Sequence, residues 1–188
     1  MVTLTTSRVD DETDFDPLSP ADAAAILDTA RELLRASRQG QSNAALKGKQ
    51  LGLMCANDTN GTTGTIGEQF KGDPENGDAA FFRLAATRLG AHVARIRPRL
   101  NAGSSASELR RLALMLGRLY DAVECQGMSV DLVQKIRAQA GVPVYFRLAG
   151  EAHPTAALTN QLDGSASPRD KRLFVLQAAL LRSLVGAA

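Results

Sequence analysis

Four short apolar runs, separated by segments of helix length, constrain the fold of this chain most strongly. Each run stops at polar or glycine-containing residues, as a buried strand does where it leads into a loop or helix. Strands that alternate with helices form a parallel sheet with helices packed on its faces. The sequence therefore predicts an α/β fold, with three layers built around a parallel sheet of about four strands. The expected strands are residues 51–56, 91–96, 121–125 and 142–146.

The segments around these runs carry helix signals. Ser19 and Pro20 supply an N-cap and a first-turn proline for a helix that ends at the turn-prone residues 39–42. Gly141 closes a later helix that Ser129 caps. Further helices are expected over residues 79–89, 107–119 and 167–184. In the second of these, the apolar residues Leu109, Leu112, Ala113, Leu116 and Leu119 fall on one predicted stripe.

Length and charge limit the classes of protein to consider. The chain has 188 residues, enough for one large domain or two very small ones. Its 22 basic and 20 acidic residues are interspersed, so charge gives no support for a nucleic-acid partner. No apolar stretch reaches the ~20 residues that span a bilayer, which predicts a cytoplasmic protein without a membrane partner. We expect no cofactor and no metal site, and the two cysteines, Cys55 and Cys125, are expected to be buried free thiols.

Ligands of such sheets bind beyond the carboxyl ends of the strands. The loops to inspect therefore begin at Asn57, Arg97, Gln126 and Leu148. Along the second strand and its end, the alternating arginines Arg95, Arg97 and Arg99 either attract an anion or form a solvated rim.

Sequence motifs in these loops resemble one enzyme family. They are the runs Leu-Met-Cys-Ala-Asn-Asp-Thr-Asn-Gly-Thr-Thr at residues 53–63, Leu-Gly-Arg-Leu-Tyr-Asp-Ala-Val-Glu-Cys-Gln-Gly at 116–127 and Gly-Glu-Ala-His-Pro-Thr-Ala at 150–156. Their order and content resemble the aspartate and ornithine carbamoyltransferases. In that family a Ser-Thr-Arg-Thr-Arg loop cradles the phosphate of carbamoyl phosphate, but here Gly61 and Thr63 replace its arginines. The phosphate-binding arginine of the second motif is replaced by Gln126.

The resemblance implies a degenerate phosphate and carbamoyl site. Its expected residues are Thr59, Asn60, Gly61, Thr62, Thr63, Gln126, His153 and Arg172. His153 matches a family histidine that contacts the carbamoyl group, which makes it the one catalytic candidate, yet its family partner glutamine is Ala156 here. The alternative for His153 is a structural hydrogen bond to a backbone carbonyl where a helix begins at Pro154.

The last helix extends the resemblance to about residues 20–185. Residues 167–184 resemble the final helix of ornithine carbamoyltransferases, which packs back on the carbamoyl-phosphate domain, and Arg172 matches its arginine. This arrangement implies a lead-in at residues 1–18, a carbamoyl-phosphate-binding-like domain at 19–166 with an insertion at 64–78, and a terminal helix at 167–188 that packs on that domain. The family's amino-acid-binding domain is missing from this arrangement.

These replacements predict lost activity within a family of amino acid metabolism. A charge-assisted hydrogen bond from arginine contributes about 1.5–3 kcal/mol, and three family arginines are absent. The expected protein is a catalytically inactive, partner-binding or regulatory homotrimer. Two alternatives stay open. The chain contributes half of a carbamoyl-phosphate site in trans to a separate carbamoyltransferase subunit, or it is a small-anion sensor whose neutral pocket includes Arg172.

Overall fold

The computed structural model describes residues 18–55, 77–98, 100 and 104–186. Helices and strands alternate along these residues, as the sequence predicts. The elements are α1 (Pro20–Arg38), β1 (Gln50–Cys55), α2 (Asp78–Arg88), β2 (His92–Ile96), α3 (Ala106–Leu119), β3 (Ala122–Gln126), α4 (Val130–Ala140), β4 (Val144–Phe146), the 3₁₀ helix η1 (Pro154–Gln161) and α5 (Pro168–Leu184).

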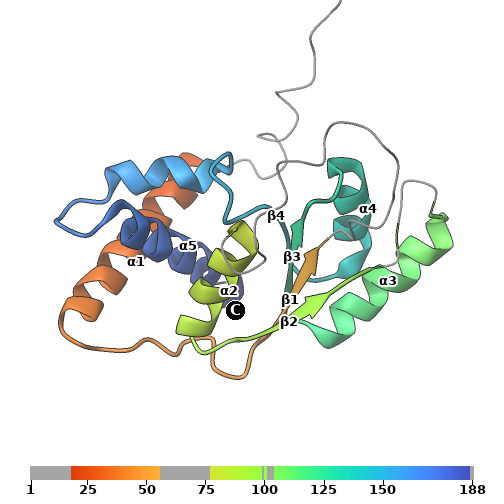
Figure 1. The fold of residues 1–188 in the computed structure, drawn as a ribbon, viewed down its shortest axis with the longest axis horizontal. Coiled ribbons are helices and arrows are strands. Elements are labelled where there is room, and N and C mark those ends of the chain that lie inside the picture. The colour runs from red at the N-terminus through yellow and green to blue at the C-terminus, as the bar shows by residue number, and fades with distance from the viewer. Residues whose placement is uncertain (1–17, 56–76, 99, 101–103, 187–188) are drawn as a thin grey trace, which may run out of the picture.

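The strands form one parallel sheet in the order β2-β1-β3-β4. Leu51 of β1 lies opposite Val93 of β2 and Ala122 of β3, and Val123 of β3 lies opposite Val144 of β4. All four strands therefore point their carboxyl ends to the same edge. The predicted α/β class with a parallel sheet of about four strands is confirmed (Figure 1).

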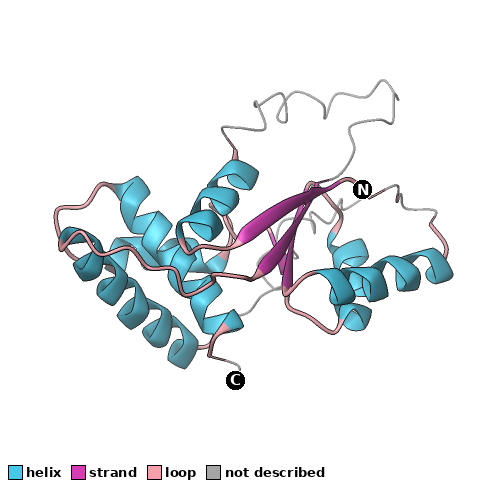
Figure 2. Ribbon diagram, turned by 90° about the horizontal axis from the view of Figure 1, so that it is seen from below, coloured by secondary structure: helices cyan, strands magenta, loops and turns pink. Residues whose placement is uncertain are grey.

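Helices cover both faces of this sheet. Figure 1 and Figure 2 show α1, α2, η1 and α5 on one side and α3 and α4 on the other. Successive residues of a strand point to opposite faces, so each strand contributes to two cores. Leu51 and Leu53 pack in the core under α1, α2 and α5, whereas Met54 packs in the core under α3 and α4.

Serine caps define the starts of three helices. The Oγ of Ser19 accepts a hydrogen bond from Asp22 N at 3.1 Å, and Ser167 does the same for Asp170 N at 3.1 Å. Ser105 and Glu108 form a reciprocal capping box, so α3 begins before the predicted Ser107. Ser129 occupies the N-cap of α4 as predicted, without a side-chain capping bond.

The apolar stripe of α3 departs from the prediction at one end. Leu109, Ala113 and Leu116 are buried, but Leu119 is 56% exposed, so its assignment to the buried stripe is wrong. Leu119 occupies the last position of α3. Leu114 and Met115 are also exposed, and they leave an apolar group on the outer side of this helix.

Helix α5 packs against α1, α2 and η1. Leu176 and Leu180 are fully buried, and Gln177 Nε2 donates to the Ala85 carbonyl of α2 at 3.3 Å. The final helix thus completes the core on one face of the sheet. Asp78, placed at the end of the expected insertion, is the first residue of α2, and residues 64–76 of that insertion lie outside the described part of the chain.

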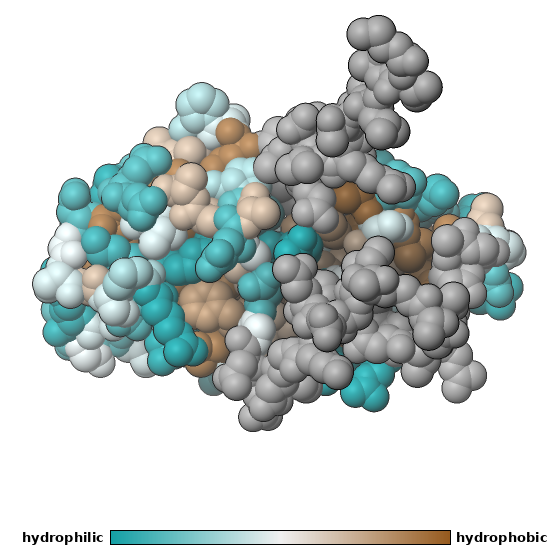
Figure 3. Space-filling view, turned by 45° about the horizontal axis from the view of Figure 1, so that its top comes forward, coloured by the Kyte–Doolittle hydropathy of each residue, from teal (hydrophilic) through white to brown (hydrophobic). Residues whose placement is uncertain are grey.

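The surface in Figure 3 mixes hydrophilic and hydrophobic residues without a simple division. Among the described residues, no helix is long and apolar enough to cross a membrane. Both cysteines are free thiols: Cys125 is buried, and Cys55 is only partly buried. They point to opposite faces of the sheet, because Cys125 belongs to the core under α3 and α4 and Cys55 packs against the other core.

Candidate functional site

Three of the expected site residues lie in the described structure. Gln126 ends β3, His153 immediately precedes η1, and Arg172 lies in the second turn of α5. The other five expected residues, Thr59, Asn60, Gly61, Thr62 and Thr63, lie outside the described residues. The geometry of the site is therefore that of the loops beyond β3 and β4.

Gln126 is held by a buried carboxylate. Its Nε2 donates to Glu124 Oε1 at 2.5 Å, and the same oxygen accepts a hydrogen bond from Leu148 N at 3.0 Å. Glu124 is fully buried and Gln126 is 9% exposed. Gln126, which replaces a family arginine, therefore uses its side-chain amide for a hydrogen bond within the protein. The expected site did not include Glu124, although an acidic residue within an apolar strand is a signal for a buried polar network.

His153 caps the 3₁₀ helix. Its Nδ1 accepts a hydrogen bond from Thr155 N at 3.2 Å and lies 2.9 Å from Thr155 Oγ1. An accepting Nδ1 places the proton of a neutral imidazole on Nε2. One of the two roles expected for His153 was a structural hydrogen bond to a backbone carbonyl. Its Nδ1 instead accepts a hydrogen bond from a backbone N–H at the start of η1.

Arg172 connects α5 to the loop after β4. Its Nη2 donates to the carbonyls of Leu148 and Gly150 at 2.9 and 3.1 Å, and its Nη1 donates to Thr155 Oγ1 at 3.1 Å. Burial lowers the pKa of the Arg172 guanidinium, and the negative charges of Asp78 and Glu151 oppose this shift. The Arg172 side chain therefore bonds both the loop after β4 and the first turn of η1.

The loop at residues 147–150 is held from two sides. Glu124 accepts from the Leu148 amide, while Arg172 donates to the Leu148 and Gly150 carbonyls. The loop begins at Arg147, a non-glycine residue with a φ of 52°, and Gly150 N donates to the Arg147 carbonyl at 2.7 Å. A left-handed residue followed by a tight turn needs support from its surroundings. Glu124 and Arg172 provide that support.

A thiol and arginines meet at the end of β1. Burial raises the pKa of Cys55, and the Arg95 side chain, which hydrogen-bonds this sulfur, acts in the opposite direction. Because burial is the larger effect, the thiol of Cys55 stays protonated at neutral pH and is a poor nucleophile. Arg95 and Arg97 are both exposed.

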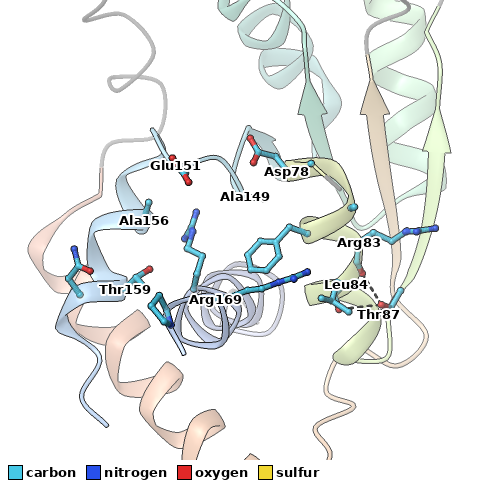
Figure 4. A pocket seen from close by; sticks show the side chains of 15 residues that line it. Asp78, Arg83, Leu84, Thr87, Ala149, Glu151, Ala156, Thr159 and Arg169 are labelled. Atoms are coloured by element: carbon cyan, nitrogen blue, oxygen red, sulfur yellow. Dashed lines mark hydrogen bonds between the residues drawn. The ribbon is translucent and has the colours of Figure 1, made fainter. Parts of the chain in front are cut away.

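A pocket of about 1030 Å³ opens beside Arg172, between α2, the loop at residues 149–151, η1 and α5 (Figure 4). Asp78 and Glu151 lie at one end in this view, and Arg169, Leu84 and Thr87 lie toward the other. Of the expected site residues, Arg172 lines this pocket, while Gln126 and His153 do not. The pocket lining is Gly77, Asp78, Ala80, Phe81, Arg83, Leu84, Thr87, Ala149, Glu151, Ala156, Thr159, Asn160, Pro168, Arg169 and Arg172.

Comparisons with known proteins give one consistent relationship. No protein-family model matches the chain. It is 32% identical over 137 residues to an ornithine carbamoyltransferase of Actinobacillus pleuropneumoniae, which covers 73% of this chain and 36% of the relative. It is also 32% identical over 145 residues to a catabolic ornithine carbamoyltransferase of Chromobacterium violaceum, covering 77% of this chain and 38% of the relative. The chain is a relative of the ornithine carbamoyltransferases.

Solved structures show the same fold. The ornithine carbamoyltransferase of Pyrococcus furiosus aligns with a TM-score of 0.56 at 21% identity, covering 76% of this chain and 40% of that one. Aspartate transcarbamoylase of Trypanosoma cruzi in complex with phosphate aligns with a TM-score of 0.55 at 22% identity, covering 80% and 43%. The expected relationship to the carbamoyltransferases is confirmed. The chain spans little more than a third of the length of the curated relatives it matches.

Proposed function

We propose that this carbamoyltransferase relative has no transferase activity and works as a trimeric, partner-binding or regulatory protein. The observation that carries the proposal is that polar groups at the described site positions bond within the protein. Gln126 bonds Glu124, His153 Nδ1 bonds Thr155, and Arg172 bonds the loop after β4.

These bonds oppose tight binding of a phosphate dianion. A neutral amide contributes less to the binding free energy of phosphate than a guanidinium does. The Gln126 amide would also have to break its hydrogen bond to the buried Glu124 carboxylate first. Glu124, two residues away, is fully buried beside the same position. Removal of several charge-assisted bonds lowers affinity by about tenfold for each 1.4 kcal/mol lost.

Carbamoyl transfer also requires an amine held beside the carbamoyl carbon, because catalysis depends on placing both reactants in one geometry. This chain corresponds to 36–38% of its curated relatives. In our proposal the retained fold serves assembly.

Turnover with carbamoyl phosphate and ornithine tests the proposal directly. The purified chain is expected to form no citrulline above the rate of the same mixture without protein. The matched control is the ornithine carbamoyltransferase of Actinobacillus pleuropneumoniae, assayed at the same subunit concentration. Citrulline formation that scales with the concentration of this chain would overturn the proposal.

The outer side of α3 supports self-association. Leu114, Met115 and Leu119 are 50%, 44% and 56% exposed, and they lie within two turns of one helix. Single exposed apolar residues are ordinary, whereas a group of them is typical of an interface. We assign this group, defined here as the α3 apolar patch, to the contact between copies of the chain.

A further inference from the structure

Strand β2 has an open outer edge. It pairs with β1 on one side and ends the sheet on the other (Figure 1). His92 N donates to the Lys49 carbonyl at 2.9 Å, so the backbone groups of His92 and of every second residue after it point toward β1. The N–H and C=O groups of Val93 and Arg95 therefore point away from the sheet, where no strand of the described chain pairs with them. An edge of this kind can accept a further strand.

Two arginines lie at the carboxyl end of this edge, on the α2 face of the sheet. Arg95 lies opposite Leu53 of β1, which packs in the core under α1, α2 and α5. The Arg95 side chain hydrogen-bonds the sulfur of Cys55, and the charge of Arg97 acts on the same thiol. Both arginines are exposed. Their positive charges are therefore close to one another and accessible from solvent.

A third arginine reaches this region from α2. Helix α2 contacts both β1 and β2, and Figure 4 shows the Arg83 side chain directed toward these strands. We call Arg83, Arg95 and Arg97 the β2 basic edge. None of the three forms an ion pair with a described carboxylate, and Asp78 is the one acidic residue among those described between 77 and 100. Positive charge therefore gathers beside the open backbone groups.

The other face of β2 is apolar. Ile96 packs against the core under α3 and α4, and Ala94 on the same face is partly buried. Successive residues of a strand point to opposite faces. A strand added at this edge would therefore place one alternate set of its side chains beside the arginines and the other set beside Ala94 and Ile96.

The charges decide which strand fits. A second copy of β2 would bring arginine beside arginine, and like charges on paired strands are destabilising. Carboxylates on every second residue would instead lie beside Arg95 and Arg97, with opposite charges paired across the two strands.

We propose that the outer edge of β2 binds an extended acidic segment of a partner protein, in which carboxylates alternate with apolar residues. The segment adds a fifth strand to the sheet. Its backbone bonds Val93 and Arg95, and its carboxylates lie along the β2 basic edge. This inference rests on the partner-binding role proposed above and names the chemistry of the partner.

Fluorescence anisotropy tests this edge, with the full chain at low salt and a labelled acetyl-Ser-Glu-Val-Glu-Val-Glu-Ser-amide peptide. We expect saturable binding that Arg83→Gln, Arg95→Gln and Arg97→Gln each weaken about 2- to 5-fold, because each removes an ion pair that solvent partly screens. Arg118→Gln is the matched control, since Arg118 is an exposed arginine of α3 on the other side of the sheet, and this variant should bind as the parent does. All four side chains are exposed, so the variants should keep the circular dichroism spectrum of the parent. Equal affinity of the parent and the three edge variants would overturn the proposal.

Two N-methylated peptides distinguish strand addition from general charge attraction. Methylation of one alternate set of peptide amides blocks the hydrogen bonds to β2, whereas methylation of the other set leaves them. The two peptides have the same charge, so we expect their affinities to differ at least about 10-fold through the backbone bonds alone. Equal affinities would overturn the proposal, as would the absence of binding of the unmethylated peptide at millimolar protein.

Other occupants of the edge give different results. A single-stranded RNA of the same charge that binds as tightly as the peptide would overturn the proposal in favour of a nucleic-acid site. The chain itself has acids on alternate residues at Asp10, Glu12, Asp14 and Asp16. Their joint replacement by Asn and Gln should leave the peptide affinity unchanged, and an increase of about 10-fold would overturn the proposal by assigning the edge to this segment. Citrulline formation and oligomeric mass test the proposed function without the peptide, so the two proposals fail separately.

Discussion

Glu124 and Arg172 are the two residues on which the loop after β4 depends. Arg172 donates three hydrogen bonds to this region, two of them to the carbonyls of Leu148 and Gly150, and both carbonyls belong to buried residues. We predict that Arg172→Ala lowers the free energy of unfolding by about 2–4 kcal/mol, because buried carbonyls would lose a charged donor. Urea unfolding followed by circular dichroism measures this change.

Arg169→Ala is the control for the Arg172→Ala stability measurement. Arg169 is an exposed arginine one turn earlier on the same helix, and it forms no ion pair with the described residues. Its replacement should change stability by no more than about 0.5 kcal/mol. Equal stability of the two variants would show that the loop does not depend on the Arg172 contacts.

For single residues, the sequence predicts which positions belong to the site but not all of their hydrogen-bond partners. The sequence predicts the positions of Gln126, His153 and Arg172, because they fall in motifs that resemble the carbamoyltransferases. Glu124 lies only two residues from Gln126 on the same strand, but the partners of Arg172 could not be predicted, because Arg172 bonds residues 22 and 24 positions away. Only the packed fold brings such groups within hydrogen-bond distance.

Helices α3 and α4 approach each other closely at Gly117. A Cβ added at Gly117 would lie 1.9 Å from the Ala140 carbonyl oxygen. We predict that Gly117→Ala destabilises the fold by about 2–4 kcal/mol: separating the two helices costs more than the ~1 kcal/mol that alanine gains in helix propensity. Thermal unfolding measures the loss. Arg118→Ala, at the neighbouring exposed position, should leave the transition within about 2 °C.

Elements were more predictable than contacts because their signals are local. The strands were predicted to within two residues, since buried parallel strands read as continuous apolar runs. The predicted fourth strand began at Val142, whereas β4 begins at Val144, after Pro143, which cannot donate to the ladder. Leu119 falls on the predicted stripe but is exposed at the last position of α3, because periodicity marks a helix face without showing which of its residues are covered.

For the whole molecule, the α3 apolar patch makes assembly testable. The chain mass is 19.9 kDa, so a trimer would have three times that mass by size exclusion with light scattering. We predict that the Met115→Glu, Leu119→Glu double variant is monomeric, because a cyclic assembly that buries these side chains cannot accept charge there without a partner. Val185→Glu is the matched control, since Val185 is 49% exposed at the end of α5 and lies outside the patch. A parent chain that runs as a monomer would contradict self-association, and a trimer that persists in the double variant would move the interface to another face.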